Sequence, residues 1–431
     1  MVNEQSGGMG VSAAARLSGY LLAACLAAAP ASLRAENPPL ASVPADSFAD
    51  KPAGIRWGGL LYNATITTGA AWDSNIFFSR NNVVSDRIVY IKPGLTVSTL
   101  DPNYKFTFRA QADHFEYDNT PAESRTNGRA EVDGTIRLRR DLEVDVGASA
   151  GHVREPRSLQ RRDLPEDAAE PVAHNIYTAR LAVRRIFNSM LTTTTAVGVE
   201  NDNYFNVRSN GGGIIDLQFL DRDLMRASQE TELKISHRLK LFSNQRVVAS
   251  DYREGVSAID RDSVKFVTVN GIEVVLTPLV KVRAYFHYGN EHFRDATIEA
   301  DPERIYGTEV TWSPRRNIKL RAAFSREFGG VSFDLDATGG RRSRVELGLD
   351  YEITRRLHLR TSFHYVHANE AAFIAGTDRI EDTYVYKASL GYHLNRIWTL
   401  TLDGLIEKRD STIPDNSFDR FVVQAGATAR F

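Results

Sequence analysis

Apolar and polar residues alternate one by one along the end of the chain, and no other feature constrains the fold as strongly. In residues 419–431 the apolar set is Phe421, Val423, Ala425, Ala427, Ala429 and Phe431, and the residues between them are mostly polar. Side chains two positions apart lie on the same face of a β-strand. The segment is therefore predicted to be a strand with one apolar face and one largely polar face.

The same alternation recurs from residue 60 onwards. It predicts about 18 strands, or about 16, because residues 204–240 can be divided in more than one way. Within that stretch, Gly211-Gly212-Gly213 and residues 214–220 are compatible with loop or strand. The predicted strands are 60–72, 84–100, 104–117, 126–139, 142–154, 174–187, 190–203, 224–239, 241–252, 262–276, 279–293, 303–313, 317–328, 341–353, 357–369, 382–394, 397–409 and 419–431.

Connections between these segments alternate between short and long. Tight ones such as Asp101-Pro102-Asn103 and Thr354-Arg355-Arg356 are followed by long polar loops such as 155–173. Tight turns at one rim and long loops at the other are typical of outer-membrane barrels. A sheet in lipid must also close, because unpaired backbone groups cannot reach water there. The sequence therefore predicts an all-β fold, a transmembrane antiparallel up-and-down β-barrel over residues 60–431.

Three further expectations concern the barrel's surroundings. An even strand number places both ends of the barrel at the short-turn rim, which we expect to face the periplasm. Aromatic residues near strand ends are expected at the membrane–water interfaces; they include Phe78, Tyr90, Phe115, Tyr117, Trp312 and Trp398. The chain ends with Phe431 on the apolar face, and we expect the barrel-assembly machinery to recognise this end, with outer-membrane lipid as the other contact.

Residues 1–35 have the layout of a secretory signal peptide. Arg16 is followed by an apolar run from Leu17 to Ala29 and by small residues before Glu36. This predicts export to the outer membrane of a Gram-negative bacterium. Residues 22–25 also resemble a lipobox ending at Cys25, but the apolar run continues beyond it, which favours ordinary cleavage. Residues 36–59 are rich in Pro and Ala and are predicted to be a periplasmic linker or a small plug.

Composition excludes several classes of function. The chain has 431 residues and a formal net charge of −1, which predicts no net field that favours nucleic acid or a ligand of one sign. Its single cysteine, Cys25, lies in the leader, so the mature chain has no thiol for a disulfide or a zinc site. Because no catalytic constellation can be assigned, we expect no enzymatic activity, cofactor or metal.

Two residue groups could nevertheless carry chemistry. His358 and His364 share a strand face, with His287 and His393 similarly phased, but nothing in their spacing indicates convergence on a metal. We interpret them as lumen-lining histidines. Residues 221–223 and 260–262 both read Asp-Arg-Asp at a loop-to-strand junction. Salt bridges between adjacent loops are favoured there over a cation or sugar site.

The polar faces together predict a hydrated interior. A charge facing hydrocarbon costs roughly 2–4 kcal/mol at the membrane midplane, so these side chains need water or one another. A barrel of roughly 16–18 strands leaves an aqueous lumen. The predicted lumen-lining residues are Lys105, Arg109, Asp113, Glu143, Asp145, Lys281, Arg283, His287, Lys319, Arg321, Arg344, Glu346, Asp350, Arg360, Lys387, Gln424 and Arg430.

Several short motifs lie at the start of the predicted barrel and at its later loop-to-strand junctions. They are Gly69-Ala70-Ala71-Trp72-Asp73-Ser74-Asn75-Ile76-Phe77, Ser85-Asp86-Arg87-Ile88, Ile91-Lys92-Pro93-Gly94-Leu95, Asp221-Arg222-Asp223, Asp251-Tyr252 and Asp260-Arg261-Asp262-Ser263. Together they resemble motifs of the putative β-barrel porin 2 family. Trp72 stands where the family usually has Tyr, and Ser74 where Asp is common.

The resemblance implies a passage for a secreted polysaccharide, docked to a periplasmic export protein. Two alternatives stay open. One is a general or nutrient-uptake porin, and the other is a structural or adhesive barrel without an open channel.

Overall fold

The computed structural model describes residues 54–156, 168–253, 260–295, 302–328, 337–372 and 379–431. They form a closed antiparallel β-barrel of 18 strands, which confirms the predicted fold class and the larger of the two strand counts. No helix in these residues is long and apolar enough to cross a membrane. The predicted signal peptide, with Cys25, lies outside the described residues.

The strands and short 3-10 helices are as follows. They are β1 (Ile55–Trp57), β2 (Leu60–Asp73), β3 (Asp86–Thr99), β4 (Tyr104–Tyr117), η3 (Pro121–Glu123), β5 (Arg125–Arg139), β6 (Leu142–Glu155), β7 (Val172–Ile186), β8 (Leu191–Tyr204), β9 (Val207–Arg208), β10 (Ile214–Ile215), η4 (Gln218–Leu220), β11 (Arg222–Lys234), β12 (Leu239–Tyr252), β13 (Ser263–Thr277), β14 (Val280–Phe293), β15 (Glu303–Arg315), β16 (Ile318–Phe328), β17 (Ala337–Thr354), β18 (Leu357–Ala372), β19 (Arg379–His393), β20 (Trp398–Ser411), η5 (Pro414–Asn416) and β21 (Phe418–Arg430).

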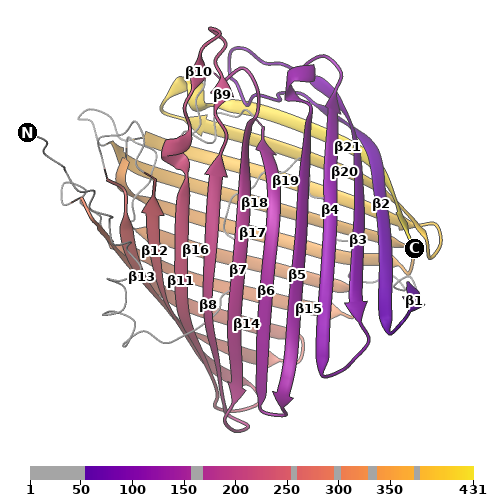
Figure 1. The fold of residues 1–431 in the computed structure, drawn as a ribbon, viewed down its shortest axis with the longest axis vertical. Helices are drawn as coiled ribbons and strands as arrows, with labels where there is room; N and C mark the ends of the chain where they lie inside the picture. Colours follow the sequence, from indigo (N-terminus) through magenta and orange to yellow (C-terminus); the bar gives the residue numbers. More distant parts are fainter. Residues whose placement is uncertain (1–53, 157–167, 254–259, 296–301, 329–336, 373–378) are drawn as a thin grey trace, which may run out of the picture.

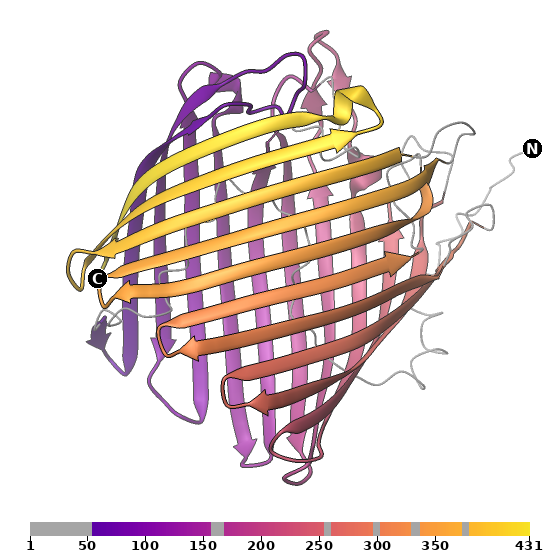
Figure 2. The same cartoon turned by 180° about the vertical axis from the view of Figure 1, so that it is seen from behind.

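Each wall strand pairs with its neighbours in chain order, and the last strand returns to the first. β21 pairs with β2 from Thr65↔Arg430 to Asp73↔Val422. The backbones of Ala64 and Phe431 also exchange two hydrogen bonds at 3.2 and 2.9 Å. Figures 1 and 2 show the indigo first strands beside the yellow last strands, and the strands of the near and far walls cross at a steep angle in both views. This closure leaves no open edge among the wall strands.

Two rims differ in the length of their connections. The short turns join β3 to β4, β5 to β6, β7 to β8, β11 to β12, β13 to β14, β15 to β16, β17 to β18 and β19 to β20. The longer connections lie at the other rim, where β9, β10 and the 3-10 helices are found (Figure 1). We call these the short-turn end and the long-loop end. The chain terminus Phe431 lies at the short-turn end, as an even strand number requires.

Strand positions follow the sequence pattern closely, and the largest difference is at the end of β11. β4 spans the predicted residues 104–117, but β11 ends at Lys234 rather than near residue 239. The turn that follows, residues 235–238, was not predicted because it contains no Gly, Pro or Asn. Its Ser236 hydroxyl instead accepts a hydrogen bond from the Arg238 backbone at 3.2 Å.

The ambiguous stretch at 204–222 is a folded loop rather than an additional pair of wall strands. β9 and β10 form a small hairpin, with Gly212 at a φ of 85° in its turn. A small apolar core holds this loop against the ends of β7 and β8; it consists of Ala168, Val172, Tyr204, Val207, Leu217 and Leu220.

Part of the predicted linker or plug, residues 36–59, is also described. β1 lies within it and pairs with the first residues of β2, from Ile55↔Tyr62 to Trp57↔Leu60. Residues 36–53 lie outside the described part of the chain.

Candidate functional site

The predicted lumen-lining residues all lie on one face of the barrel wall. Residues paired directly on neighbouring antiparallel strands share a face, and the pairing can be followed around the closed sheet. One row runs Asp350, Arg360, Ser389, Asp403 and Gln424. We call this the polar face. All the predicted lumen-lining residues fall on it, from Lys105 on β4 to Arg430 on β21.

The opposite face carries large apolar side chains that are exposed. Examples are Phe106, Phe108, Leu347, Leu402, Ile406, Phe421 and Val423. We call it the apolar face. The two faces thus separate charge from hydrocarbon-like surface along nearly every strand, which is the arrangement that a membrane-spanning wall requires.

Ion pairs join neighbouring strands along the polar face. The Arg109 guanidinium on β4 lies 2.6 Å from Asp133 and 3.2 Å from Glu131, both on β5. Asp133 also accepts a hydrogen bond from Arg180 of β7 at 2.5 Å. A single group of charges therefore spans four consecutive strands and holds these long side chains along the wall.

Similar groups recur on the following strands. Glu143 pairs with Arg137 at 2.9 Å and with Arg184 at 3.1 Å. Further along, Lys281 lies 2.8 Å from Glu273, which also faces Lys240 at 3.7 Å. Each group takes one charge from each of three adjacent strands.

The remaining predicted residues divide into paired and unpaired members. His287 lies 3.4 Å from Glu303, Arg321 lies 3.1 Å from Glu309, His364 lies 3.9 Å from Glu346, and Arg360 donates to Asp350. Asp113 and Asp145 accept hydrogen bonds from Gln111 and Thr135. Gln424 is buried, and the Arg283 guanidinium lies over the Phe242 ring. Four of the predicted residues have no ion-pair partner in the described part of the chain, namely Lys105, Lys319, Arg344 and Lys387.

Two of the four histidines come together on the polar face. The rings of His358 on β18 and His393 on β19 are 4.8 Å apart, whereas His287 and His364 each face a glutamate. Within the described residues, no group of three or more His, Cys, Asp or Glu is arranged to hold a metal ion.

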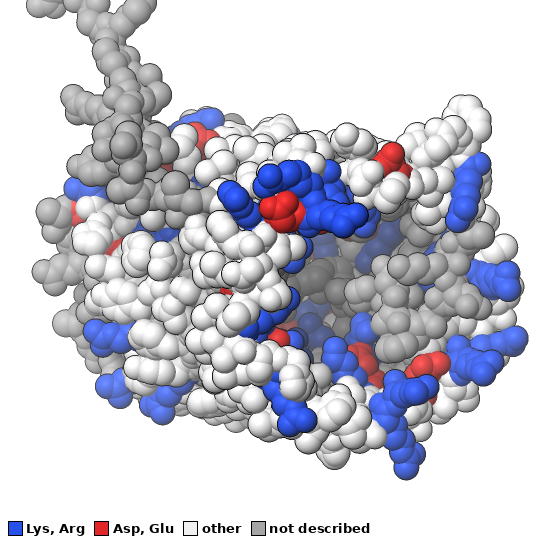
Figure 3. All heavy atoms as spheres, turned by 90° about the horizontal axis from the view of Figure 1, so that it is seen from below, with Lys and Arg blue, Asp and Glu red and all other residues white. Residues whose placement is uncertain are grey.

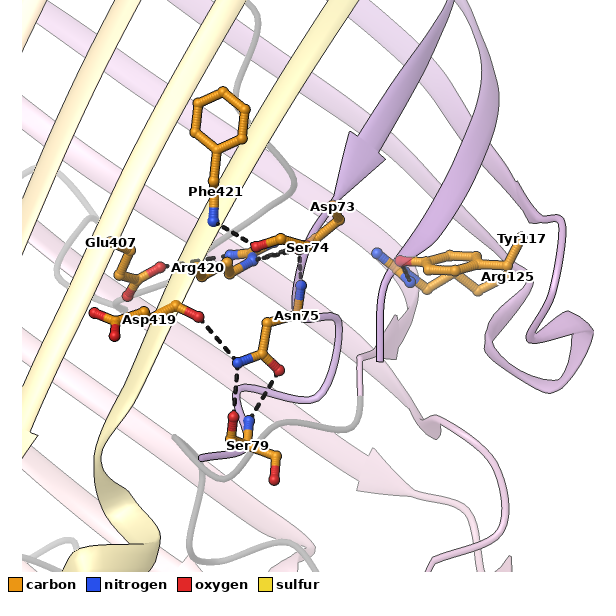
Figure 4. Close-up of polar contacts among 10 residues, drawn as sticks. All are labelled: Asp73, Ser74, Asn75, Ser79, Tyr117, Arg125, Glu407, Asp419, Arg420 and Phe421. Carbon is orange, nitrogen blue, oxygen red and sulfur yellow. Dashed lines mark hydrogen bonds and ion pairs between the residues drawn. The ribbon is translucent and has the colours of Figure 1, made fainter. Parts of the chain in front are cut away.

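A buried polar clasp joins the first and last strands at the long-loop end (Figure 4). The Arg420 guanidinium of β21 donates to both carboxylate oxygens of Asp73, with distances of 2.6 and 3.1 Å. Glu407 of β20 lies 3.5 Å away on its other side. The Phe78 ring stacks over Arg420 at 4.3 Å. These residues were not predicted as a group, because Asp73 and Arg420 are 347 positions apart in the sequence.

Asn75 extends the clasp into the loop after β2. Its backbone N–H donates to Asp73, and its side-chain amide donates to the carbonyls of Ser79 and Asp419. Ser74 and Phe421 exchange hydrogen bonds at 2.9 and 2.8 Å across the same seam. The Asp73-Ser74-Asn75 segment, which the sequence supplied only as part of a family motif, therefore ties the ends of the barrel together.

Several aromatic residues expected at the membrane interface lie elsewhere. Phe78, Tyr90, Phe115 and Tyr117 are buried on the polar face or in the loop above it, and each is at most 6% exposed. The phenol of Tyr90 lies over Gly69 and Gly426, where an added Cβ would collide with its hydroxyl group. The interface prediction was wrong for these four because proximity to a strand end does not indicate which face a ring occupies. Trp312 and Trp398 are exposed on the apolar face.

The two Asp-Arg-Asp segments form bridges between adjacent strand ends, as the structural interpretation predicted. Asp221 accepts from the backbone of Tyr204 and pairs with Arg253 at 3.2 Å. Asp262 accepts from the backbone of Tyr252 and pairs with Arg294 at 2.6 Å. The arginine partners come from the next loop rather than from within each segment.

Comparison with known proteins identifies the family. A family model described as putative beta-barrel porin 2 matches residues 49–431, which is most of the chain. The chain belongs to the putative beta-barrel porin 2 family. As a porin-like closed barrel of this family, it is an outer-membrane protein. Porins as a class are channels rather than enzymes.

Other comparisons add little about function. Curated proteins give no match. Among solved structures, OccAB4 of Acinetobacter baumannii aligns with a TM-score of 0.49 and 11% identity, covering 86% of this porin and 98% of that chain. A BenF-like porin from Pseudomonas fluorescens Pf-5 aligns with a TM-score of 0.49 and 10% identity, and the alignment covers 86% of this porin and 99% of that chain. Such low values do not indicate a shared substrate.

Proposed function

We propose that this porin forms a water-filled pore for hydrophilic solutes across the outer membrane, with the polar face lining the lumen. One observation carries the proposal: the charged side chains of the wall strands are gathered on one face of a closed sheet, opposite a face of exposed apolar side chains. Charges in this number cannot face hydrocarbon. The polar face must therefore enclose water.

The cross-strand ion pairs support an open interior. Groups such as Arg109 with Glu131 and Asp133 neutralise one another along the wall, so their side chains need not reach across the barrel for partners. A barrel of roughly 16–18 strands is wide enough to leave an aqueous channel. Figure 3 shows a hollow at the short-turn end with charged side chains around it.

Export of a secreted polysaccharide, in contact with a periplasmic export protein, is a narrower form of the same proposal. It comes from the family resemblance, and general or nutrient uptake fits the geometry at least as well. Recognition of Phe431 by the assembly machinery is a separate proposal, supported by its exposed position at the end of the apolar face.

Conductance in planar bilayers tests the pore directly. The purified full-length mature barrel is expected to give discrete steps of current in potassium chloride. A folded barrel that inserts but stays silent would favour a structural or adhesive role. Deletion of the gene followed by assay of cell-surface polysaccharide tests the narrower form, because unchanged export would remove it.

A further inference from the structure

The short turns are markedly basic. Six arginines lie in these turns, and we call them the arginine rim: Arg140, Arg238, Arg316, Arg355, Arg356 and Arg396. The three short turns without one are each flanked within two residues by a basic side chain, namely Lys105, Arg185 or Lys281. A basic side chain therefore lies in or beside every short turn, and of the three flanking residues Lys281 is paired with Glu273 at 2.8 Å.

The arginine rim is exposed and uncompensated. All six side chains are exposed, and within the described residues none of them has an ion-pair partner. The acidic residues of the short turns are Asp101 and Asp141. Asp141 is paired with Arg139 at 3.0 Å, and Asp101 accepts hydrogen bonds from the backbones of Asn103 and Tyr104.

Positive charge continues from the rim onto the polar face. Lys105, Lys234 and Lys319 lie at the short-turn ends of their strands, are exposed, and have no ion-pair partner among the residues that the structure describes. Seen from below, Lys and Arg side chains gather around the hollow of the barrel (Figure 3). The excess of positive charge thus surrounds the mouth rather than lying on the apolar face alone.

The near-zero net charge of the chain conceals this arrangement. The sequence-based expectation concerned the net field of the whole chain, in which 53 basic and 54 acidic residues nearly cancel, and it says nothing of how these charges are distributed between the two ends. A ring of like charges around a mouth with low-dielectric walls concentrates ions of the opposite sign. Rings of Arg or Lys are a known basis for selecting anions in pores.

We propose that the short-turn mouth is an anion-collecting site and that the solutes of this pore are anionic, bearing carboxylate, sulfate or phosphate groups. This inference rests on the proposed pore function and adds the class of solute. Phosphates of membrane lipids are the competing ligand. They do not account for Lys105, Lys234 and Lys319, whose side chains project from the face opposite to the lipid.

Ion selectivity in a bilayer of neutral phosphatidylcholine tests the proposal. Under a gradient of potassium chloride, the reversal potential is expected to show a preference for chloride over potassium. Changing all six arginines of the rim to Gln should lower the chloride-to-potassium permeability ratio at least about twofold near 0.1 M salt. The difference should largely disappear at 1 M, where the Debye length falls to about 3 Å.

A matched pair of triple variants separates position from net charge. The first variant removes three charges from the rim by changing Arg316, Arg355 and Arg356 to Gln. The second variant removes three exposed charges at the long-loop end by changing Arg80, Arg87 and Arg208 to Gln. Only the first triple should shift selectivity. An equal shift from both, or none from the rim, would overturn the inference while the pore itself stands. A silent wild-type barrel would instead remove the proposed function.

A polyanion probe requires no variant. Dextran sulfate added on the short-turn side is expected to block current at lower concentration than neutral dextran of the same size. Equal block by the two polymers would contradict an anion-collecting mouth.

Discussion

The two ends of the barrel place arginine in opposite surroundings. At the long-loop end, only 8% of the Arg420 side chain is exposed, and it is held between Asp73 and Glu407. At the short-turn end, Arg356 is exposed and has no ion-pair partner in the described part of the chain. A buried and paired charge fixes the structure around it, whereas an exposed and unpaired charge acts through its field on ions in solution.

This contrast extends to the acidic residues. Asp73, Asp86, Asp202, Asp221 and Asp262 lie at or near the long-loop end, and each is at most 7% exposed. Asp86, for example, accepts hydrogen bonds from the backbones of Asn119 and Thr120 and from both of their side chains. The long-loop end is thus held together by buried carboxylates, whereas the short turns need only their tight hairpins.

The largest effect is expected from Asp73→Ala. This substitution leaves Arg420 buried with only Glu407 at 3.5 Å, and breaking one side of a buried ion pair costs about 3–5 kcal/mol. Urea unfolding in lipid vesicles, with the gel shift between heated and unheated samples as a second readout, measures the loss.

Asp419→Ala is the control for this substitution, because Asp419 is an exposed neighbour at the same seam. Its stability should stay within about 0.5 kcal/mol of wild type. If the two variants lose comparable free energy of unfolding, then the buried ion pair of the clasp does not stabilise the closed barrel more than an exposed residue at the same seam.

A smaller loss is expected from Asp262→Ala at the same end. Its carboxylate accepts from the Tyr252 backbone at 2.8 Å and pairs with Arg294 at 2.6 Å. This hydrogen bond is partly buried, and leaving a donor at such a site without its acceptor costs at most about 1–3 kcal/mol. The same unfolding assay applies, with Asp118→Ala as the comparison, since Asp118 forms only an exposed pair with Arg87 at 3.9 Å. If Asp262→Ala is as stable as wild type, then among the two sites tested only the carboxylate of the clasp stabilises the long-loop end.

The wall was readable from the sequence because its signal is local. Alternation with a period of two fixes both the position of a strand and the face of each side chain, so β4 and the polar face could be predicted together. The turn at 235–238 was missed because a serine supplies the turn contact without Gly, Pro or Asn.

Features that depend on the assembled barrel could not be read in this way. Asp73 and Arg420 meet only when the last strand returns to the first. Tyr90 lies over glycines of β2 and β21, which no local pattern reveals. Five of the six arginines of the rim lie in the predicted short turns, and Arg238 lies in the turn that was missed. A net charge summed over the whole chain does not record these positions, on which the effect of the rim depends.

The wall between the two ends should give an intermediate result. Arg109 contacts Glu131 and Asp133, but 49% of its side chain is exposed. Arg109→Ala is therefore expected to cost at most about 1 kcal/mol, as for other solvated ion pairs. Lys105→Ala, on the same face of the same strand and without a partner among the described residues, should leave unfolding unchanged. A loss as large as that of Asp73→Ala would mean that the wall pairs are as dry as the clasp, which would count against a hydrated lumen.

The smallest effect on stability is expected from Arg356→Gln. Because this side chain is exposed and lacks an ion-pair partner among the described residues, its replacement should change the free energy of unfolding by no more than about 0.5 kcal/mol. The urea midpoint in vesicles of neutral lipid measures it, with Asp73→Ala as the sensitive reference. Loss of stability here would mean that the turn arginine holds structure as Arg420 does. An unchanged midpoint would mean that Arg356 does not stabilise the fold, and that it acts through its electric field on ions at the mouth, unlike Arg420.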